Sequence, residues 1–558
     1  MNEAAIPLEQ LIEELSCPGA YPESVETVEL RQTHISVVFL AGSHVYKVKK
    51  PVKLPFLDFS TLQQRKFYCD QEVRLNRRLA PEVYLGVVPI YSTSAGLRIG
   101  DTQTDGKHGS DPIVEWAVWM TRLPEENTFA SRMEREILTD TQVEKLALRI
   151  ADFHQRSQEQ DGSAADQSKT ARILECGSFD RIAGAVRDNL AFAKQQIGQT
   201  ITASVYQRLH GATERALQQF RLLIERRVSS GMIRDLHGDL HLDHVYLFED
   251  KQPPADLVIV DCIEFNDAFR FIDVVADIAF CRMDLLRHGH RGLAGTLTRA
   301  YFDATGDQEG IQLLPFYTAY RAAVRGKVDA ITSLEAEVPQ SQREAAAARA
   351  TAYWLLALGE LESAEQRPVL VLATGLPGTG KSTLARGLTQ QMNLRWIRSD
   401  AVRKDLASQA GLDVTAEAGA YQAGIYTTEW TERTYAECLR QALSALRLGE
   451  RVVVDATFLE ELRRHEFLEG AIQLGVPAVW LLCDAAPDLV RDRLANRRDD
   501  VSDADWSIYT KAASAWQQPS VSSQRSLVTI DANQNPELML AQAISAVSNF
   551  GSVLALGR

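Results

Sequence analysis

Gly375-Leu-Pro-Gly-Thr-Gly-Lys-Ser-Thr383 is the stretch that decides the fold of the last third of the chain. It follows the apolar run 369–373 and precedes an amphipathic stretch that begins at Leu384, which predicts a strand, a tight loop and a helix. The spacing G-x-x-x-x-G-K-[ST] is typical of a loop whose backbone N–H groups surround phosphate oxygens, because glycines allow close approach to the anion. The sequence therefore predicts a nucleoside triphosphate site.

Every position of this loop is a candidate nucleotide contact. Lys381, which we also count as catalytic, is expected to reach the β- and γ-phosphates, and the Ser382 hydroxyl is expected to hold Mg²⁺. A glycine-rich turn without a ligand is the alternative. The predicted nucleotide-binding positions are Gly375, Leu376, Pro377, Gly378, Thr379, Gly380, Lys381, Ser382 and Thr383.

Composition indicates a folded chain of several domains, since 558 residues correspond to about three or four domains of ordinary size. No run of about 20 apolar residues occurs, and residues 1–10 lack a basic flank and an apolar core, so neither a membrane span nor a secretory signal is expected. Seven scattered cysteines without a C-x-x-C pair favour the reducing cytoplasm. A net charge of -14 disfavours nucleic acid as a partner.

Three polar residues follow later predicted strands of the same third. Asp400 is expected to orient or deprotonate an acceptor hydroxyl, and Arg403 to hold an anionic group of the substrate. A helix N-cap is the alternative for Asp400, because Ser-Asp before a helix is a common cap. Asp455 ends the apolar run 452–454 and is expected to support Mg²⁺. No second acid is adjacent, which favours transfer to an acceptor over mechanical work.

A basic helix is predicted after the strand 479–483. Arg497 is expected there to close over the transferring phosphoryl group, and a solvated basic helix is the alternative. With the loop at 375–382, Asp400, Arg403 and Asp455, this region resembles the P-loop kinases with a zeta-toxin-like or gluconate-kinase-like core. The resemblance implies a three-layer α/β fold with a parallel sheet and the use of ATP and Mg²⁺. Polynucleotide 5′-kinase domains share the pattern.

In the N-terminal half, the stretch Val45-Tyr-Lys-Val-Lys49 alternates on a period of two. Lys47 and Lys49 are therefore expected on one face of a strand in a hairpin, where an anion would lie against them; a solvated edge strand is the alternative. Glu72, in a helical pattern over 61–79, is a candidate ion-pair partner for one lysine, and an ordinary surface charge is the alternative.

A second chemical stretch contains Asp239 and Asp261. Asp261 follows four apolar residues and is expected at the end of a buried strand, where a carboxylate must be paired or hold a metal. Phosphoryl transfer requires two acids, one that accepts the proton of the acceptor hydroxyl and one that holds Mg²⁺.

The order Lys47/Lys49, Glu72, hinge, His237-Gly-Asp239, Asp261 resembles the aminoglycoside phosphotransferase family, a branch of the protein-kinase-like fold. This implies a two-lobed α+β domain in which Lys47 or Lys49 binds phosphates and pairs with Glu72. It also implies Asp239 as the catalytic base and Asp261 as a Mg²⁺ ligand. His244 stands where the family usually has a metal-binding Asn. It would hold Mn²⁺ better, leave the metal to Asp261, or mark a domain with weak or no catalysis.

A hydrolytic metal site is a rival interpretation of the same stretch, since five potential ligands lie within eight residues: His237, Asp239, His241, Asp243 and His244. No second cluster of histidines is apparent in the sequence. Three later acids are expected to cap, form ion pairs or lie on the surface: Asp273, Asp277 and Asp284.

Together these patterns predict an α/β multidomain protein. Its expected parts are an N-terminal extension (1–27), a small lobe (28–122), a large lobe (123–345), a helical linker (346–366) ended by Pro368, and a P-loop kinase domain (367–550). The expected function is a bifunctional, ATP-dependent transfer of phosphate to hydroxyl groups of small molecules. The alternative is a non-catalytic, nucleotide- or substrate-sensing N-terminal half beside a single kinase, with a small molecule or a nucleic-acid end as its acceptor.

Overall fold

The computed structural model describes residues 6–100, 111–157, 164–412, 427–496 and 505–550. The chain divides into two compact units. Unit 1 comprises Met1–Ile182, Leu223–Cys281 and Leu297–Gln308, and unit 2 comprises Ala183–Leu222, Arg282–Thr296 and Glu309–Arg558. Four of the five divisions fall within helices: α6 (Phe179–Gln195), α7 (Ala203–Ser229), α9 (Val274–Arg287) and α10 (Arg291–Thr305). The fifth, between Gln308 and Glu309, follows α10. The domain boundaries expected from the sequence stay predictions.

Unit 1 contains a six-stranded sheet with the order β1-β2-β3-β8-β6-β7, in which all neighbours are antiparallel. Its strands are β1 (Val28–Gln32), β2 (Ser36–Ala41), β3 (His44–Lys49), β6 (Tyr84–Thr93), β7 (Gly96–Ile99) and β8 (Ile113–Thr121). The predicted hairpin is confirmed as β2 and β3. It turns at Gly42, whose φ of 60° lies in the left-handed region that glycine adopts without a steric cost.

The two faces of this sheet have different partners. Phe39 and Tyr46 lie in a core that α1 (Leu8–Leu15) completes on one face. On the other face α2 (Leu62–Asn76) packs against β6 and β8. Because alternate strand residues point to opposite faces, Lys47 and Lys49 both reach the α2 side. The ammonium groups of Lys47 and Lys49 therefore both lie on the side of the sheet that α2 covers.

The rest of unit 1 is mainly helical, with two short antiparallel ribbons that carry the predicted chemical residues. The ribbons pair β9 (Ile233–Asp235) with β12 (Phe271–Asp273) and β10 (Val245–Leu247) with β11 (Leu257–Ile259). Cys69, Val118 and Val258 share one buried cluster, which packs β11 against α2 and β8. The other elements are β4 (Lys53–Leu54), β5 (Leu57–Asp58), α3 (Phe129–Glu134), α4 (Asp140–Arg156), α5 (Ala164–Cys176) and α8 (Asp267–Arg270).

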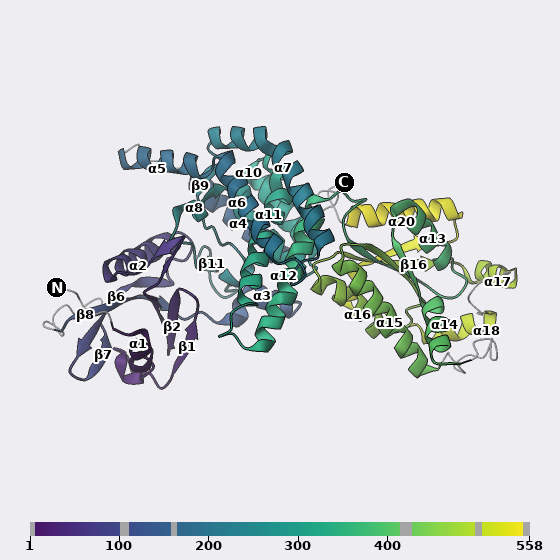
Figure 1. The fold of residues 1–558 in the computed structure, drawn as a ribbon, viewed down its shortest axis with the longest axis horizontal. Helices are drawn as coiled ribbons and strands as arrows, with labels where there is room; N and C mark the ends of the chain where they lie inside the picture. Colours follow the sequence, from purple (N-terminus) through teal and green to yellow (C-terminus); the bar gives the residue numbers. More distant parts are fainter. Residues whose placement is uncertain (1–5, 101–110, 158–163, 413–426, 497–504, 551–558) are drawn as a thin grey trace. The chain divides into compact units, whose positions relative to one another are not determined.

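Unit 2 contains a five-stranded parallel sheet with the order β14-β15-β13-β16-β17, as predicted for a parallel α/β fold. Its strands are β13 (Val369–Thr374), β14 (Arg395–Arg398), β15 (Arg451–Asp455), β16 (Ala478–Asp484) and β17 (Leu527–Asp531). Helices α13 (Lys381–Met392) and α20 (Pro536–Phe550) lie on one face, and α15 (Thr428–Arg447) and α16 (Glu461–Gln473) on the other (Figure 1). The remaining helices are α14 (Ser399–Gln409), α17 (Pro487–Ala495), α18 (Trp506–Ala515) and α19 (Val521–Gln524).

Two long helices precede this sheet in unit 2, α11 (Gly310–Thr332) and α12 (Gln340–Leu361). They pack closely, because a Cβ on Gly326 would lie 3.1 Å from the fully buried ring of Trp354. The expectation that the helix runs to Pro368 is wrong, since α12 ends at Leu361. Glu362 is extended there, and its carboxylate forms an ion pair with Arg208 at 2.6 Å.

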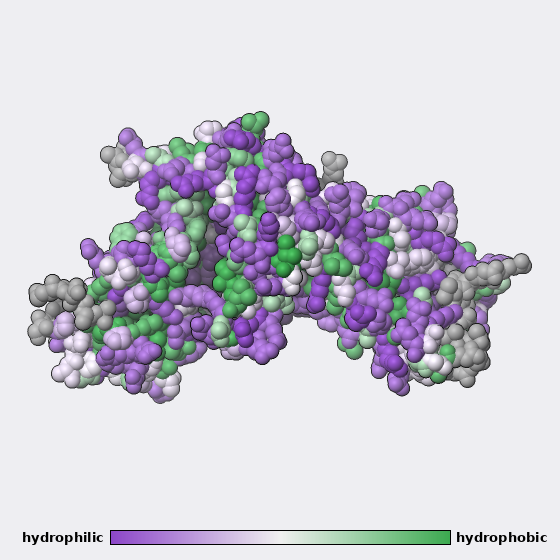
Figure 2. All heavy atoms as spheres, in the orientation of Figure 1, coloured by the Kyte–Doolittle hydropathy of each residue, from purple (hydrophilic) through white to green (hydrophobic). Residues whose placement is uncertain are grey.

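The surface carries both hydrophobic and hydrophilic residues. On the face drawn in Figure 2, hydrophobic residues are scattered among hydrophilic ones. Large apolar side chains that are exposed include Leu222 and Val521. No helix in the described part of the chain is long and apolar enough to cross a membrane.

Candidate active sites

Two lysines and three carboxylates form one charge cluster in unit 1. Lys47 Nζ lies 2.9 Å from Glu72 Oε1 and 2.7 Å from Asp261 Oδ1. Lys49 Nζ lies 2.7 Å from Glu72 Oε2 and also pairs with Glu264. The side chains of Lys49 and Glu72 have no exposed surface, whereas that of Asp261 is 45% exposed. The structure therefore brings together four of the predicted residues and adds Glu264, for which the sequence predicted no role.

Pairing outweighs burial for most of these groups. Burial alone would lower the pKa of Lys47, but Asp261 and Glu72 raise it well above its usual value. Burial would raise the pKa of Asp261, yet Lys47, followed by His244, holds it below its usual range. Glu264 differs, because burial raises its pKa despite Lys49. Lys47 thus stays charged and Asp261 ionised at neutral pH.

A cavity of about 310 Å³ opens beside this cluster, and Lys47 lines it whereas Lys49 does not. Its apolar walls come from Val38, Leu40, Val45, Val83, Tyr84, Met120, Leu123, Tyr246 and Val260. Asp243, His244 and Asp261 lie with Lys47 among its polar residues. A slot with apolar walls and a few convergent charges has the character of a small-molecule site. Asp261 has a φ of 63°, a strained value for a residue other than glycine, and such strain is found at functional sites.

Asp277 holds the loop that carries Asp239. The backbone N–H groups of His237 and Gly238 donate to its carboxylate at 3.2 and 2.9 Å, and His154 Nε2 lies 3.1 Å from it. A Cβ on Gly238 would lie 2.6 Å from the carbonyl oxygen of Phe269, so the loop needs glycine there. Asp277 is fully buried, so a surface role is wrong for it. Its position within the apolar stretch 274–280 was the available signal.

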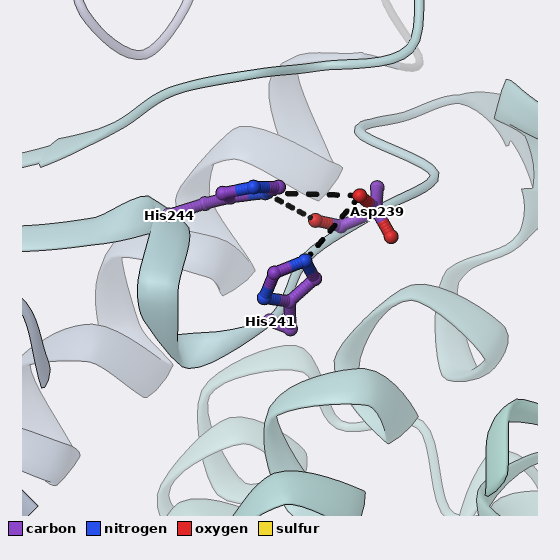
Figure 3. Close-up of side chains that lie close together, drawn as sticks. All are labelled: Asp239, His241 and His244. Carbon is purple, nitrogen blue, oxygen red and sulfur yellow. Dashed lines mark hydrogen bonds and ion pairs between the residues drawn. The ribbon is translucent and has the colours of Figure 1, made fainter. Parts of the chain in front are cut away.

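His241 and His244 lie beside Asp239 (Figure 3). His241 Nε2 is 3.4 Å and His244 Nδ1 is 3.9 Å from Asp239 Oδ2, and one ligand atom from each of the three residues lies within 4.8 Å of the others. Asp243 Oδ2 lies 3.4 Å from His241 Nδ1. His237 points elsewhere, with its Nε2 2.9 Å from the carbonyl oxygen of Val260, and burial lowers its pKa to about 4. Of the five ligands in the rival interpretation, three converge.

In unit 2, residues 375–380 form a tight loop between β13 and α13. Gly375, Gly378 and Gly380 have φ values of 137°, 81° and 100°, which side chains rarely tolerate. A Cβ on Gly375 would also lie 2.6 Å from the carbonyl oxygen of Cys483. Lys381 opens α13, and its Nζ donates to the carbonyl oxygen of Leu376 at 3.3 Å. The predicted order of strand, loop and helix is confirmed.

Asp455 ends β15 beside this loop, because it pairs in register with Ala373 of β13. It is 3% exposed, and burial raises its pKa although Lys381 and a hydrogen bond from Ser382 lower it. Within the described residues its Oδ2 accepts no hydrogen bond, and Arg398 Nε lies 3.8 Å away. A buried carboxylate oxygen without a donor, next to a serine hydroxyl, fits a hard cation such as Mg²⁺.

The other predicted residues of unit 2 have mixed outcomes. Asp400 lies in the first turn of α14, but the residue before this helix is Arg398 and no side chain caps it, so the capping alternative is wrong. Arg403 is 7% exposed, and its Nη1 donates to Thr431 Oγ1 at 3.2 Å. Arg497 lies outside the described residues.

Residues 370–516 match the family described as "AAA domain", and this match includes the loop at 375–383. Over 486 residues the chain is 32% identical to "Uncharacterized protein Rv2004c" of Mycobacterium tuberculosis and to "Uncharacterized protein Mb2027c" of Mycobacterium bovis, covering 87% of this chain and 89% of each relative. The chain belongs to the family of these mycobacterial proteins.

Two solved structures resemble about a third of the chain. A sugar kinase from Janibacter sp. HTCC2649 is 18% identical and covers 34% of this chain and 98% of its own, with a TM-score of 0.25. A gluconokinase from Sinorhizobium meliloti 1021 is 16% identical and covers 33% of this chain and 93% of its own, also with a TM-score of 0.25.

Proposed function

We propose that the chain is an ATP-dependent phosphotransferase with two nucleotide sites. The observation that carries this proposal is the orphaned, buried oxygen of Asp455 beside Ser382 at a loop of three left-handed glycines. In unit 2 the loop backbone binds the phosphates, Lys381 contacts the β- and γ-phosphates, and Ser382 and Asp455 hold Mg²⁺. A bound Mg²⁺ neutralises charge on the phosphates during transfer.

The acceptor of unit 2 is proposed to be a hydroxyl group of a small molecule. Asp400 orients this hydroxyl or accepts its proton. The hydroxyl oxygen bonds to the γ-phosphorus as the bond from that phosphorus to ADP breaks and ADP leaves. Arg403 binds an anionic group of the acceptor, an interaction that requires its buried guanidinium to turn from Thr431.

Unit 1 is proposed to be a second, kinase-like phosphotransferase, as its resemblance to the aminoglycoside phosphotransferases implies. The cavity supports this role, since its apolar walls suit a purine ring and Lys47 and Asp261 suit the phosphates and a metal. Lys47 is the phosphate-binding lysine, because Lys49 is fully enclosed by Glu72 and Glu264. Asp239, on a loop fixed by Asp277, accepts the proton of the acceptor hydroxyl.

A non-catalytic unit 1 is the second candidate function. The observation that favours it is the place of His244, whose Nε2 lies 3.6 Å from Asp261 Oδ2 where a Mg²⁺ ligand is expected, although imidazole binds Mg²⁺ poorly. In that case unit 1 binds a nucleotide or substrate as a sensor, and only unit 2 transfers phosphate.

Transfer of label from γ-labelled ATP into a fractionated small-metabolite extract tests these proposals. Lys381→Ala should abolish one set of labelled products, and Asp239→Asn a different set, while the exposed Lys511→Ala on α18 should change neither. If Asp239→Asn matches the wild type and Lys381→Ala loses every product, unit 1 is the sensor. If the wild type labels no metabolite but labels nucleic-acid ends, with binding that falls steeply with salt, the small-molecule proposal is wrong.

A further inference from the structure

The loop around Asp239 carries two histidines that transfer with Mg²⁺ does not require. His241 presents its Nε2 to Asp239 and its Nδ1 to the carboxylate of Asp243, each at 3.4 Å. An imidazole with one nitrogen toward a shared point and the other against a carboxylate is the usual arrangement of a metal-binding histidine, because the carboxylate fixes the tautomer and the ring.

His244 is oriented by a backbone contact. Its Nδ1 lies 3.0 Å from the backbone carbonyl oxygen of Asp239 and 3.9 Å from Asp239 Oδ2, and its Nε2 lies 3.6 Å from Asp261 Oδ2. A carbonyl only accepts hydrogen bonds, so Nδ1 carries the hydrogen in the metal-free ring, and the ring must turn for the lone pair of Nε2 to face Asp239 and His241. The rings of His241 and His244 lie against each other with centroids 3.9 Å apart, and their side chains are only 10% and 16% exposed. Two imidazoles are therefore packed together beside Asp239 before any ion arrives.

The dimensions suit a small ion with nitrogen and oxygen ligands. Four ligands at about 2.1 Å around a tetrahedral ion lie about 3.4 Å apart. The ligand atoms of Asp239, His241 and His244 lie within 4.8 Å of one another, and the contact from His241 to Asp239 is already 3.4 Å. Asp239 is 33% exposed, so its side chain can turn to close the remaining gap. Two nitrogens and a carboxylate oxygen favour Zn²⁺ and similar ions over Mg²⁺.

We propose that Asp239, His241 and His244 bind a divalent transition metal ion, with Zn²⁺ preferred over Mg²⁺, and that the bound ion blocks phosphate transfer in unit 1. The block rests on the proposed function, in which Asp239 is the base. A carboxylate oxygen that gives its lone pair to a metal cannot also accept the proton of an acceptor hydroxyl. Zn²⁺ bound to Asp239, His241 and His244 would stop phosphate transfer by unit 1 and leave transfer by unit 2 unchanged.

Binding is tested without any activity assay, by titration of the untagged full-length protein with Co²⁺ and visible absorption in the absence of nucleotide. The wild type should show the intense bands of low-coordinate Co²⁺, and Zn²⁺ should remove them. His241→Ala and His244→Asn should each weaken binding at least about tenfold, and Asp243→Asn by about tenfold. His210→Ala, at an exposed histidine of α7, is the matched control and should bind as the wild type does. Absent bands in the wild type, or bands unchanged in both histidine variants, would overturn the site.

His244→Asn also guards against misfolding, because it restores the Asn of the family pattern. It should lose Co²⁺ while circular dichroism stays that of the wild type.

The block is tested on the labelled products. Zn²⁺ at concentrations that fill the Co²⁺ site should suppress the product that depends on Asp239 and spare the product that depends on Lys381. In His241→Ala, half-inhibition should need at least about tenfold more Zn²⁺. An Asp239-dependent product that Zn²⁺ does not suppress would overturn the block. If no product depends on Asp239 in metal-free protein, the proposed function of unit 1 fails, and the Co²⁺ bands alone decide whether the metal site exists.

Discussion

The two candidate sites, both proposed to bind phosphate, are built from different parts of the chain. Unit 2 uses backbone: the six residues 375–380, three of them left-handed glycines, form the loop between a strand and a helix. Unit 1 uses side chains, and the contact between Lys47 and Asp261 joins residues 214 positions apart. A backbone site is ready before the ligand arrives, because its N–H groups are fixed by the loop. A side-chain site holds its charges in mutual ion pairs, which a bound anion must exchange.

The largest effect is expected where the ion-paired site is broken. Glu72→Ala leaves Lys47 and Lys49 with one fewer carboxylate partner, and removing one partner of a buried pair costs about 3–5 kcal/mol. Urea unfolding should show an early transition shifted by this amount, while nucleotide binding at the loop of unit 2 persists. Glu82→Ala, at an exposed glutamate of the same lobe, is the control and should unfold like the wild type. Equal curves for both variants would mean that the cluster adds nothing to folding.

The second effect is a loss of stability of unit 1 in acid, through Asp235. Burial would raise the pKa of Asp235, but Arg78 and Arg270 lower it to about 2 from an unfolded value of 3.8. A carboxyl whose pKa is lowered by folding stabilises the protein above the unfolded pKa, and this stabilisation, about 2 kcal/mol, disappears as the pH falls from about 4 toward 2. Asp235→Asn should therefore be less stable than the wild type at pH 7 and converge with it in acid. Asp250→Asn, at an exposed site, should follow the wild type throughout.

The smallest effect should distinguish the two lysines. In a Lys381→Ala background, Lys47→Met should weaken ATP binding to unit 1 at least about tenfold, since a lost charge-assisted contact is worth about 1.5–3 kcal/mol. Lys49→Met should instead lower the unfolding temperature more than it changes affinity, because Lys49 does not line the cavity. Titration with a fluorescent nucleotide measures the affinity of each variant, and thermal unfolding measures its unfolding temperature. A larger loss of affinity in Lys49→Met would reverse the assignment.

The sequence predicted most where the chemistry is contiguous. The loop at 375–383, the hairpin that carries Lys47 and Lys49, and the strand that ends at Asp455 all follow from local patterns. Grouping Lys47, Glu72 and Asp261 required a resemblance, since no periodicity connects them.

Other features depend on tertiary contacts and could not be predicted locally. Glu264 reaches Lys49 across 215 positions, and the contacts of Asp277 with His154 and the loop at 237–238 join residues far apart in the sequence, although its apolar neighbours signalled its burial. The helix α12 also ends earlier than expected, at Leu361, where the extended Glu362 pairs with Arg208. Each of these features involves contacts between residues far apart in the sequence.

Arg208 also fixes where the chain can be cut. Besides Glu362, it donates to the carbonyl oxygens of Gln366 and Gly449, and neighbouring Ser204 donates to that of Leu448. A fragment that begins at residue 367 would contain the whole parallel sheet and yet lose every one of these donors, exposing the segment that leads into β15. The piece of sequence that looks self-contained is therefore a poor expression fragment, and a soluble P-loop fragment needs residues from α7 onward.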